Sequence, residues 1–294
     1  MMNTYSYTPE MGKINASLDV IAANLDNAVS DDVLVHCMSL MDLTTLRAED
    51  TPASVLKLVR KVNSFKSKFP DYPLPASICV FPNYASLIRE NLVAPGVGVT
   101  CVSGGFPASQ TFLDVKVREA ELAVENGADE IDIVLALNAF LAGDEEGARR
   151  EIRAVREAVD KAGVKAGRTI TLKVILETGL LISPEKIAEA SFLAMEEGAD
   201  FIKTSTGKVS VNATPVAAYV MCESIKAYYK MTGRKVGFKA AGGISSAKDA
   251  VCYYMIVKSV LGDSWTGRDL FRFGVSRLAN SLMSAKEQQN VVYF

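Results

Sequence analysis

Histidine is almost absent from this sequence of 294 residues, in which His36 is the only one. A metal site built from several imidazole ligands is therefore excluded, and catalysis by a histidine base would have to use this one residue. His36 falls at the start of the first predicted strand, so we expect it near the face of the fold opposite the polar strand ends. A packed or surface role is the more common one for such a residue.

The five cysteines are odd in number, widely spaced and never arranged as C-x-x-C. This spacing indicates neither a disulfide framework nor a zinc knuckle. We expect reduced thiols in or near the core, at Cys37, Cys79, Cys101, Cys222 and Cys252.

A strong charge of either sign is also missing, because 32 Lys+Arg face 34 Asp+Glu and the formal net charge is −2. Without a long basic run the chain offers little to a phosphate backbone or an anionic lipid, so neither nucleic acid nor a membrane is expected as partner. The first twenty residues lack a basic region followed by an apolar core, and no window approaches the ~18 apolar residues of a membrane span. We therefore expect a cytoplasmic protein, for which a small anionic substrate stays open.

Eight short apolar segments recur along the chain, and 49% of all residues are apolar. Runs such as IDIVLAL and LKVILE are continuously apolar, which is typical of parallel strands covered on both faces. Eight such units over about 260 residues favour an α/β fold, a closed (β/α)8 TIM barrel, over an open sheet. The predicted strands are 33–41, 77–81, 98–103, 130–135, 170–177, 201–204, 236–240 and 270–274.

Segments with the chemistry of a helix start follow several of these strands. Thr51-Pro52, Ser183-Pro184 and Thr214-Pro215 each place a capping hydroxyl before a proline, and apolar residues at helical spacing follow. We expect an N-terminal helical extension at 1–30, the barrel at 31–285 and a C-terminal tail at 286–294.

Polar residues collect where the predicted strands end, which is where the loops of such a barrel carry the chemistry. Lys203 ends the apolar strand ADFIK, and Lys239 holds the equivalent place in the next one, VGFK. A lysine in an apolar strand either reaches solvent or has a task inside the barrel, and for Lys203 alone the two are about equally common. Two neighbouring inward ammonium groups repel, and together with desolvation this lowers the pKa of at least one of them. A neutral amine is a nucleophile for a carbonyl, with which it forms a Schiff base.

Asp132 places a carboxylate within the apolar strand EIDIV. It could pair with an interior lysine or transfer a proton, and the two roles are compatible because a carboxylate near a lysine pair can hold a water.

Two glycine-containing loops suggest a phosphate site, because glycine lets backbone N–H groups approach an anion at a helix N-terminus. Gly207-Lys208 follows Lys203 in one loop, and Gly242-Gly243 follows Lys239 in the other. Ser276 lies after the eighth strand, where barrels often bind phosphate. A Gly-Gly pair alone is more often only a tight turn.

Four motifs resemble those of the deoxyribose-phosphate aldolase family: MDLTTL at 41–46, FIKTSTGK at 201–208, VNAT at 211–214 and GFKAAGG at 237–243. The resemblance extends from about Leu40 to Ser276. It implies a class I aldolase that needs neither metal nor cofactor, acts on a small phosphorylated sugar and forms a homodimer. Its expected reaction is the reversible cleavage of 2-deoxy-D-ribose 5-phosphate to D-glyceraldehyde 3-phosphate and acetaldehyde.

The resemblance also implies roles for individual residues. Lys203 would form the Schiff base, Lys239 would depress its pKa and help to move protons, and Asp132 would activate a water for proton transfer. Substrate hydroxyls would contact Asp42 and Thr206. The phosphate would be bound by Gly207, Lys208, Gly242, Gly243 and Ser276.

Some positions depart from the family pattern. Ala240 stands where proline is common, and Arg277 replaces a small hydroxyl residue, where it could add a phosphate contact or block one. By the same resemblance, Tyr293 would be the counterpart of a family tyrosine at the C-terminus that can assist proton transfer. These departures keep two alternatives open, a barrel that binds a partner with little turnover and an aldolase for a different aldehyde.

Overall fold

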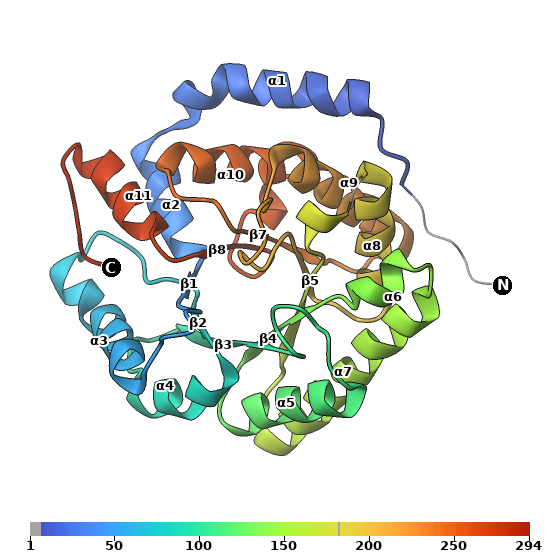
Figure 1. The fold of residues 1–294 in the computed structure, drawn as a ribbon. Helices are drawn as coiled ribbons and strands as arrows, with labels where there is room; N and C mark the ends of the chain where they lie inside the picture. The colour runs from blue at the N-terminus through green and yellow to red at the C-terminus, as the bar shows by residue number, and fades with distance from the viewer. Residues whose placement is uncertain (1–6, 182) are drawn as a thin grey trace.

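The computed structural model describes residues 7–181 and 183–294, and it is a closed barrel of eight parallel strands ringed by helices (Figure 1). The strands pair in chain order and β8 closes onto β1, so the predicted (β/α)8 fold is confirmed. The strands are β1 (Met41–Thr44), β2 (Ser77–Val80), β3 (Gly98–Ser103), β4 (Glu130–Val134), β5 (Thr171–Ile175), β6 (Phe201–Lys203), β7 (Gly237–Ala241) and β8 (Phe271–Val275).

At least one helix follows each strand and covers the outer face of the barrel. The helices are α1 (Met11–Ala28), α2 (Asp31–Ser39), α3 (Pro52–Lys68), α4 (Ala85–Asn91), α5 (Leu113–Glu125), α6 (Leu137–Leu141), α7 (Glu145–Ala166), α8 (Pro184–Glu196), α9 (Pro215–Thr232), α10 (Ala247–Leu261) and α11 (Leu278–Glu287). Single 3-10 turns occur at η1 (Pro82–Tyr84), η2 (Thr178–Leu180) and η3 (Asp263–Trp265). None of the helices in the described part of the chain is long and apolar enough to cross a membrane.

The three predicted helix starts are confirmed. The hydroxyls of Thr51, Ser183 and Thr214 cap α3, α8 and α9, each accepting a hydrogen bond from a backbone N–H of the first turn. Such a cap satisfies a donor that has no partner within the helix and contributes about 1 kcal/mol. Seven of the eight strands lie within two residues of their predicted bounds.

The prediction for the first strand, 33–41, is wrong. Most of that segment is helix α2, whose Ser30 cap accepts from Val33 N, and the strand begins only at Met41. The buried residues of the helix, Leu34, Cys37 and Met38, are spaced three and four apart, as on one face of a helix. A short apolar run does not distinguish a strand from a buried helix, and the segment 33–41 is short enough to fit either.

His36 consequently lies on α2 rather than on a strand. It is half-buried, and its Nε2 donates to the carbonyl oxygen of Thr266 at 2.8 Å. This contact ties α2 to the loop before β8.

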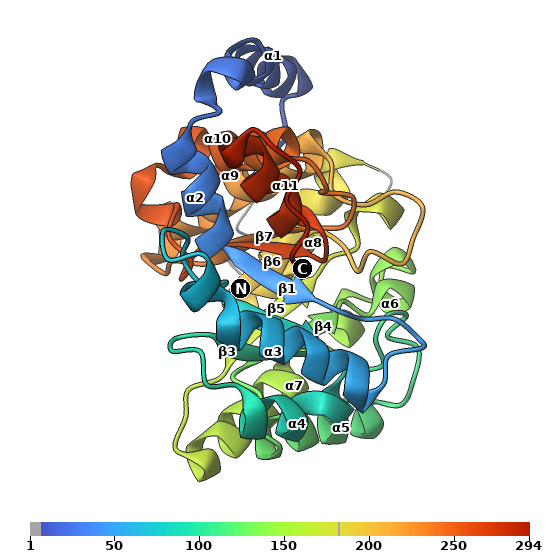
Figure 2. The same cartoon turned by 90° about the vertical axis from the view of Figure 1, so that its left-hand side faces the viewer.

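Helix α1 lies outside the barrel, across α9 and α10 (Figure 2). It packs through Ile14 and Ile21, two turns apart on one face, and Ser17 Oγ lies 3.1 Å from Tyr219 Oη. Residues 1–6 of the predicted extension lie outside the described residues.

The chain ends against α3 and α11. Asn280 accepts at Oδ1 from the N–H groups of Tyr293 and Phe294, both at 2.9 Å, and donates to the carbonyl oxygen of Phe294 at 2.8 Å. The Phe294 ring lies 5.1 Å from that of Phe65, between ring centroids. The last residues are therefore held on the outside of the barrel.

Candidate active site

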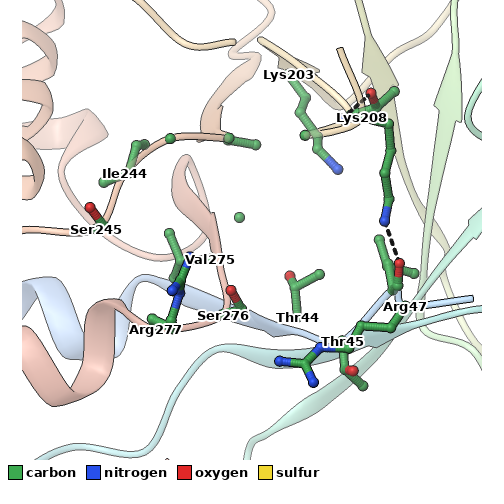
Figure 3. A pocket seen from close by; sticks show the side chains of 17 residues that line it. Thr44, Thr45, Arg47, Lys203, Lys208, Ile244, Ser245, Val275, Ser276 and Arg277 are labelled. Carbon is green, nitrogen blue, oxygen red and sulfur yellow. Dashed lines mark hydrogen bonds between the residues drawn. The ribbon is translucent and has the colours of Figure 1, made fainter. Parts of the chain in front are cut away.

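A pocket of about 360 Å³ opens at the carboxyl ends of the strands (Figure 3), and we call it the strand-end pocket. The loops after β1, β6, β7 and β8 form its walls, as expected for a barrel whose chemistry lies at this face. Its lining residues are Thr44, Thr45, Leu46, Arg47, Lys203, Thr206, Gly207, Lys208, Ala241, Gly242, Gly243, Ile244, Ser245, Gly274, Val275, Ser276 and Arg277.

Lys203 lies at the floor of this pocket as the last residue of β6. Its side chain is only 4% exposed, and its Nζ donates to Asp132 Oδ2 at 2.9 Å. The amine is thus nearly desolvated yet still reaches the cavity.

Lys239 is paired directly with Lys203 in the register of β6 and β7. Its Nζ donates to the same oxygen, Asp132 Oδ2, at 2.8 Å and to Asp42 Oδ2 at 2.5 Å. The structure therefore brings the two lysines and Asp132 together around one carboxylate oxygen, with Lys239 fully buried and outside the pocket lining.

Three further charged residues below this group were missed from the sequence. Lys173 Nζ donates to Asp132 Oδ1 at 2.9 Å and to Glu130 Oε2 at 2.5 Å. Arg272 donates to Glu130 Oε1 at 2.8 Å and to Asp42 Oδ1 at 2.5 Å. The signal that pointed to Lys203, a charge inside an apolar strand, is present at each of these positions and could have found them.

Together these residues form one buried ion-pair network inside the barrel. Its members are Asp42, Glu130, Asp132, Lys173, Lys203, Lys239 and Arg272. Three carboxylates face four cationic groups, so the fully ionised network carries one excess positive charge. Burying net charge is costly, and loss of one proton makes the network neutral.

Burial lowers the pKa of Lys203, and the Lys239 ammonium adds to this effect while Asp132 opposes it. Desolvation thus outweighs the repulsion between the lysines, which the sequence reasoning had put first. For Lys239, burial also lowers the pKa, but Asp132 and Asp42 outweigh it and the pKa is raised. Burial would raise the pKa of Asp132, yet the three lysines around it hold that pKa well below its usual range. Lys203 is therefore the amine of this pair that is prepared to be neutral.

Asp42 does not line the strand-end pocket. It is the second residue of β1 and fully buried, because the strand continues to Thr44 rather than ending at Asp42. Its Oδ1 accepts from Ser77 Oγ at 2.8 Å, and its other contacts lie within the ion-pair network. In this structure Asp42 supports Lys239 instead of facing a ligand.

The loop after β6 carries Thr206, Gly207 and Lys208 along one wall of the pocket. Thr206 donates to the buried carboxylate of Glu177 through its hydroxyl and its backbone N–H, at 2.5 and 3.1 Å. The same hydroxyl accepts from Lys208 N at 3.0 Å, and Lys208 Nζ donates to Leu46 O at 2.5 Å. Lys208 thus joins the β6 loop to the β1 loop over the pocket.

Gly242 and Gly243 form the opposite wall in a left-handed backbone conformation, with φ of 83° and 78°. A Cβ added to Gly242 would lie 2.6 Å from Asn212 Oδ1, so only glycine fits there. Without side chains, the backbone N–H groups of these two residues are accessible from the pocket, which favours an anion. Ser276 lies nearby, just before α11, whose first turn has no side-chain cap.

Tyr293 lies away from the pocket. Its hydroxyl donates to Lys61 O at 2.7 Å and lies 2.9 Å from Ser64 Oγ, both on α3, and its ring packs against that of Phe65. In this structure Tyr293 has no contact with the groups around Lys203, whereas Arg277 does line the pocket.

Comparison with known proteins shows close relatives over most of the chain. Residues 37–276 match the model of the DeoC/LacD family aldolase. The deoxyribose-phosphate aldolase of Homo sapiens is 39% identical over 264 residues, which cover 85% of this chain and 79% of the human protein. That of Mus musculus is 40% identical over 271 residues, covering 87% and 80%. The solved structure of the tetrameric deoxyribose phosphate aldolase from Aeropyrum pernix has a TM-score of 0.67 at 28% identity and covers 92% of this chain and 98% of its own.

Proposed function

The chain belongs to the DeoC/LacD family of aldolases, and on this basis we propose that it is a class I aldolase that reversibly cleaves 2-deoxy-D-ribose 5-phosphate to D-glyceraldehyde 3-phosphate and acetaldehyde. The observation that carries the proposal is the Lys203 amine, nearly desolvated at the floor of the pocket and hydrogen-bonded to Asp132. Burial lowers the pKa of this amine and so increases the fraction of the neutral form, which is the form that attacks a carbonyl.

In the cleavage direction the neutral Lys203 amine adds to C1 of the open-chain sugar, and loss of water leaves an iminium ion. Acetaldehyde contains C1 and C2, so the C2–C3 bond must break. The C3 hydroxyl gives up its proton, the C2–C3 electron pair moves into the iminium, and D-glyceraldehyde 3-phosphate leaves an enamine on Lys203. Protonation at C2 and hydrolysis then release acetaldehyde and the free amine.

The ion-pair network supplies the proton transfers. Asp132 is ionised and its Oδ2 touches both lysine amines, so it can hold a water that takes the C3 proton and returns one to C2. Lys239 stays protonated, because Asp132 and Asp42 raise its pKa, and it orients Asp132. Asp42 therefore acts on the substrate indirectly, through Lys239.

The walls of the pocket suit a phosphorylated sugar. We assign the phosphate to the N–H groups of Gly207, Gly242 and Gly243, with Lys208 and the Ser276 hydroxyl beside them. Thr206 also lines the pocket, and we assign it to the substrate hydroxyls.

Borohydride trapping tests the proposal. Incubation with 2-deoxy-D-ribose 5-phosphate and borohydride should add the mass of a reduced adduct to the wild type and to Lys208→Ala, which keeps a different lysine of the pocket as control. Lys203→Ala should stay unlabelled, and equal labelling of Lys203→Ala would refute the role of this amine. Labelling and turnover should persist after chelation of metal ions, because the iminium serves as the electron sink.

The alternative of a barrel that only binds a partner has no support at the site, because every group of the proposed mechanism is present. We further propose a cytoplasmic homodimer. Light scattering of the purified protein tests the oligomeric state, and cell fractionation tests the location.

A further inference from the structure

Glu177 is a buried carboxylate outside the ion-pair network. It lies just before η2 and is 1% exposed. Asp42, Glu130 and Asp132 are each paired with at least two cations. In the described part of the chain no lysine or arginine nitrogen lies within 4.0 Å of the Glu177 carboxylate, which instead accepts hydrogen bonds. Burying a carboxylate without a cation is costly unless such hydrogen bonds satisfy it.

The backbone of Glu177 is strained as well. Its φ of 53° and ψ of 58° lie in the left-handed region, which is unfavourable for a residue with a side chain. A strained position persists only where the surrounding structure holds it, and such positions cluster at functional sites. The fold therefore accepts two unfavourable features at one residue, beside a loop that forms a wall of the strand-end pocket.

Both oxygens of Glu177 are engaged by Thr206 of that loop. Oε1 accepts from Thr206 N at 3.1 Å, and Oε2 accepts from the Thr206 hydroxyl at 2.5 Å. The hydroxyl proton is thus committed to Glu177. The hydroxyl oxygen has two lone pairs, one of which accepts from Lys208 N at 3.0 Å. The other has no partner among the described residues, so Thr206 can only accept a hydrogen bond from a ligand in the pocket.

We propose that Glu177 is a positioning residue that makes the Thr206 hydroxyl a pure acceptor for the C4 hydroxyl of the substrate. This inference rests on the proposed function. The C3 oxygen becomes a carbonyl when the C2–C3 bond breaks, and a carbonyl oxygen cannot donate to Thr206. The C4 hydroxyl keeps its proton throughout the reaction and can donate at every stage. Glu177 thereby makes the site select a donor at C4 over a group that only accepts.

Glu177→Gln reverses this polarity at nearly unchanged shape. The backbone N–H of Thr206 can only donate, so the amide oxygen of the new side chain must face it and the amide nitrogen must face the Thr206 hydroxyl. That nitrogen donates to the hydroxyl oxygen and frees the hydroxyl proton. In the variant, Thr206 can therefore donate to a ligand group that only accepts.

The test is the addition of acetaldehyde to two acceptor aldehydes, D-glyceraldehyde 3-phosphate and its 2-deoxy-2-fluoro analogue. The fluorine replaces the hydroxyl that becomes the C4 hydroxyl of the product, and it cannot donate a hydrogen bond. The measured quantity is the ratio of kcat/KM for the hydroxyl acceptor to that for the fluoro acceptor. Differences in intrinsic reactivity cancel when this ratio is compared between proteins. Glu177→Gln should lower the ratio roughly tenfold, the scale of one hydrogen bond.

Two further variants show whether the effect passes through Thr206. Thr206→Val removes the hydroxyl and should also lower the ratio. Adding Glu177→Gln to Thr206→Val should change the ratio by less than about twofold, because the group that Glu177 orients is gone. Glu157→Gln, which changes an exposed glutamate on α7, is the matched control and should keep the ratio of the wild type.

Two results would overturn the proposal. An unchanged ratio in Glu177→Gln would make Glu177 a structural residue, since a loosened loop affects both acceptors alike. A further tenfold fall when Glu177→Gln is added to Thr206→Val would mean that Glu177 acts by a route other than Thr206.

Binding without reaction separates this inference from the proposed function. Calorimetry measures the Kd of 2-hydroxypropyl phosphate and of 2-fluoropropyl phosphate, which carry the same two groups but no aldehyde. The wild type should prefer the hydroxyl compound, and Glu177→Gln should lower this preference roughly tenfold. An unchanged preference refutes the role of Glu177. A wild type that cleaves no 2-deoxy-D-ribose 5-phosphate but shows this change of preference on substitution refutes the proposed function alone.

Discussion

The fully ionised ion-pair network carries one excess positive charge. This excess predicts how the pH dependence of the activity shifts when the charges of the network are removed one at a time. Arg272→Met removes a cation and leaves three cations facing three carboxylates when Lys203 is protonated, so the pKa of Lys203 should rise. Glu130→Gln removes an anion and leaves four cations facing two carboxylates when Lys203 is protonated, so the pKa of Lys203 should fall. The two variants are expected to act in opposite directions.

The magnitude follows from the barrel geometry. Arg272 on β8 and Glu130 on β4 each lie two strands from Lys203 on β6. With neighbouring strands about 4.8 Å apart, each charge is roughly 10 Å from the Lys203 amine. At an effective dielectric constant of about 20, two unit charges at that distance interact by roughly 1.7 kcal/mol. This corresponds to about 1.2 pKa units in either direction.

The assay is the pH profile of kcat/KM for 2-deoxy-D-ribose 5-phosphate cleavage between about pH 5 and 9. Its acid limb reports the free enzyme, in which Lys203 must be neutral to react. The limb should move up by about one unit in Arg272→Met and down by about one in Glu130→Gln. Glu130 keeps its contact with Lys173 at 2.5 Å when Arg272 is removed, so it stays ionised.

Breaking a buried ion pair costs about 3–5 kcal/mol of stability, so both variants need a check by circular dichroism that they remain folded at the assay temperature. Arg150→Met, which changes an exposed arginine on α7, controls for net charge and should leave the limb in place. Shifts of the same sign in both variants, or no shift in either, would show that charge balance does not set the pKa of Lys203.

Two further changes test the walls and the end of the chain. Gly242→Ala should raise KM for the phosphorylated sugar about tenfold, because its φ of 83° and the 2.6 Å approach of the new Cβ to Asn212 Oδ1 strain the site. Gly233→Ala is the control, since Gly233 has a φ of 71° but no atom within 4 Å of an added Cβ. Equal increases of KM in the two variants, measured by steady-state kinetics, would contradict the argument. Tyr293→Phe should leave kcat within twofold, because its hydroxyl contacts Lys61 O outside the pocket, and a tenfold loss of kcat would show that the tail moves into the site.

The sequence predicted the barrel and the position of Lys203, because both depend on local patterns. Continuous apolar runs such as β5 report a strand buried on both faces, and a lysine at the end of such a run is conspicuous. It did not predict α2, since Leu34, Cys37 and Met38 fit a helix face and a strand run equally well at that length. Because α2 was predicted as a strand, the start of β1 was also mispredicted, and so was the burial of Asp42 within that strand.

The charged residues in the lower half of the ion-pair network could be noticed one by one in the sequence, but their contacts could not be predicted. Glu130, Lys173 and Arg272 each place a charge in an apolar strand, yet they are far apart in the chain and no strand shows which of them meet. Only closure of the barrel turns all three inward to one place, where their charges compensate. Pairing across a closed barrel is a tertiary property that no single strand carries.

The choice among the three buried lysines follows from the same closure. Lys173 lies within 4 Å of three carboxylates, Lys239 of two and Lys203 of one, Asp132. Each carboxylate favours the protonated amine, so Lys173 and Lys239, whose pKa values are raised, hold a proton more firmly than Lys203, whose pKa is lowered. Lys203 is also the one of the three that lines the pocket. The excess proton of the network therefore leaves from Lys203, the amine that lines the pocket. Lys173 and Lys239 stay charged and hold Asp132 beside Lys203.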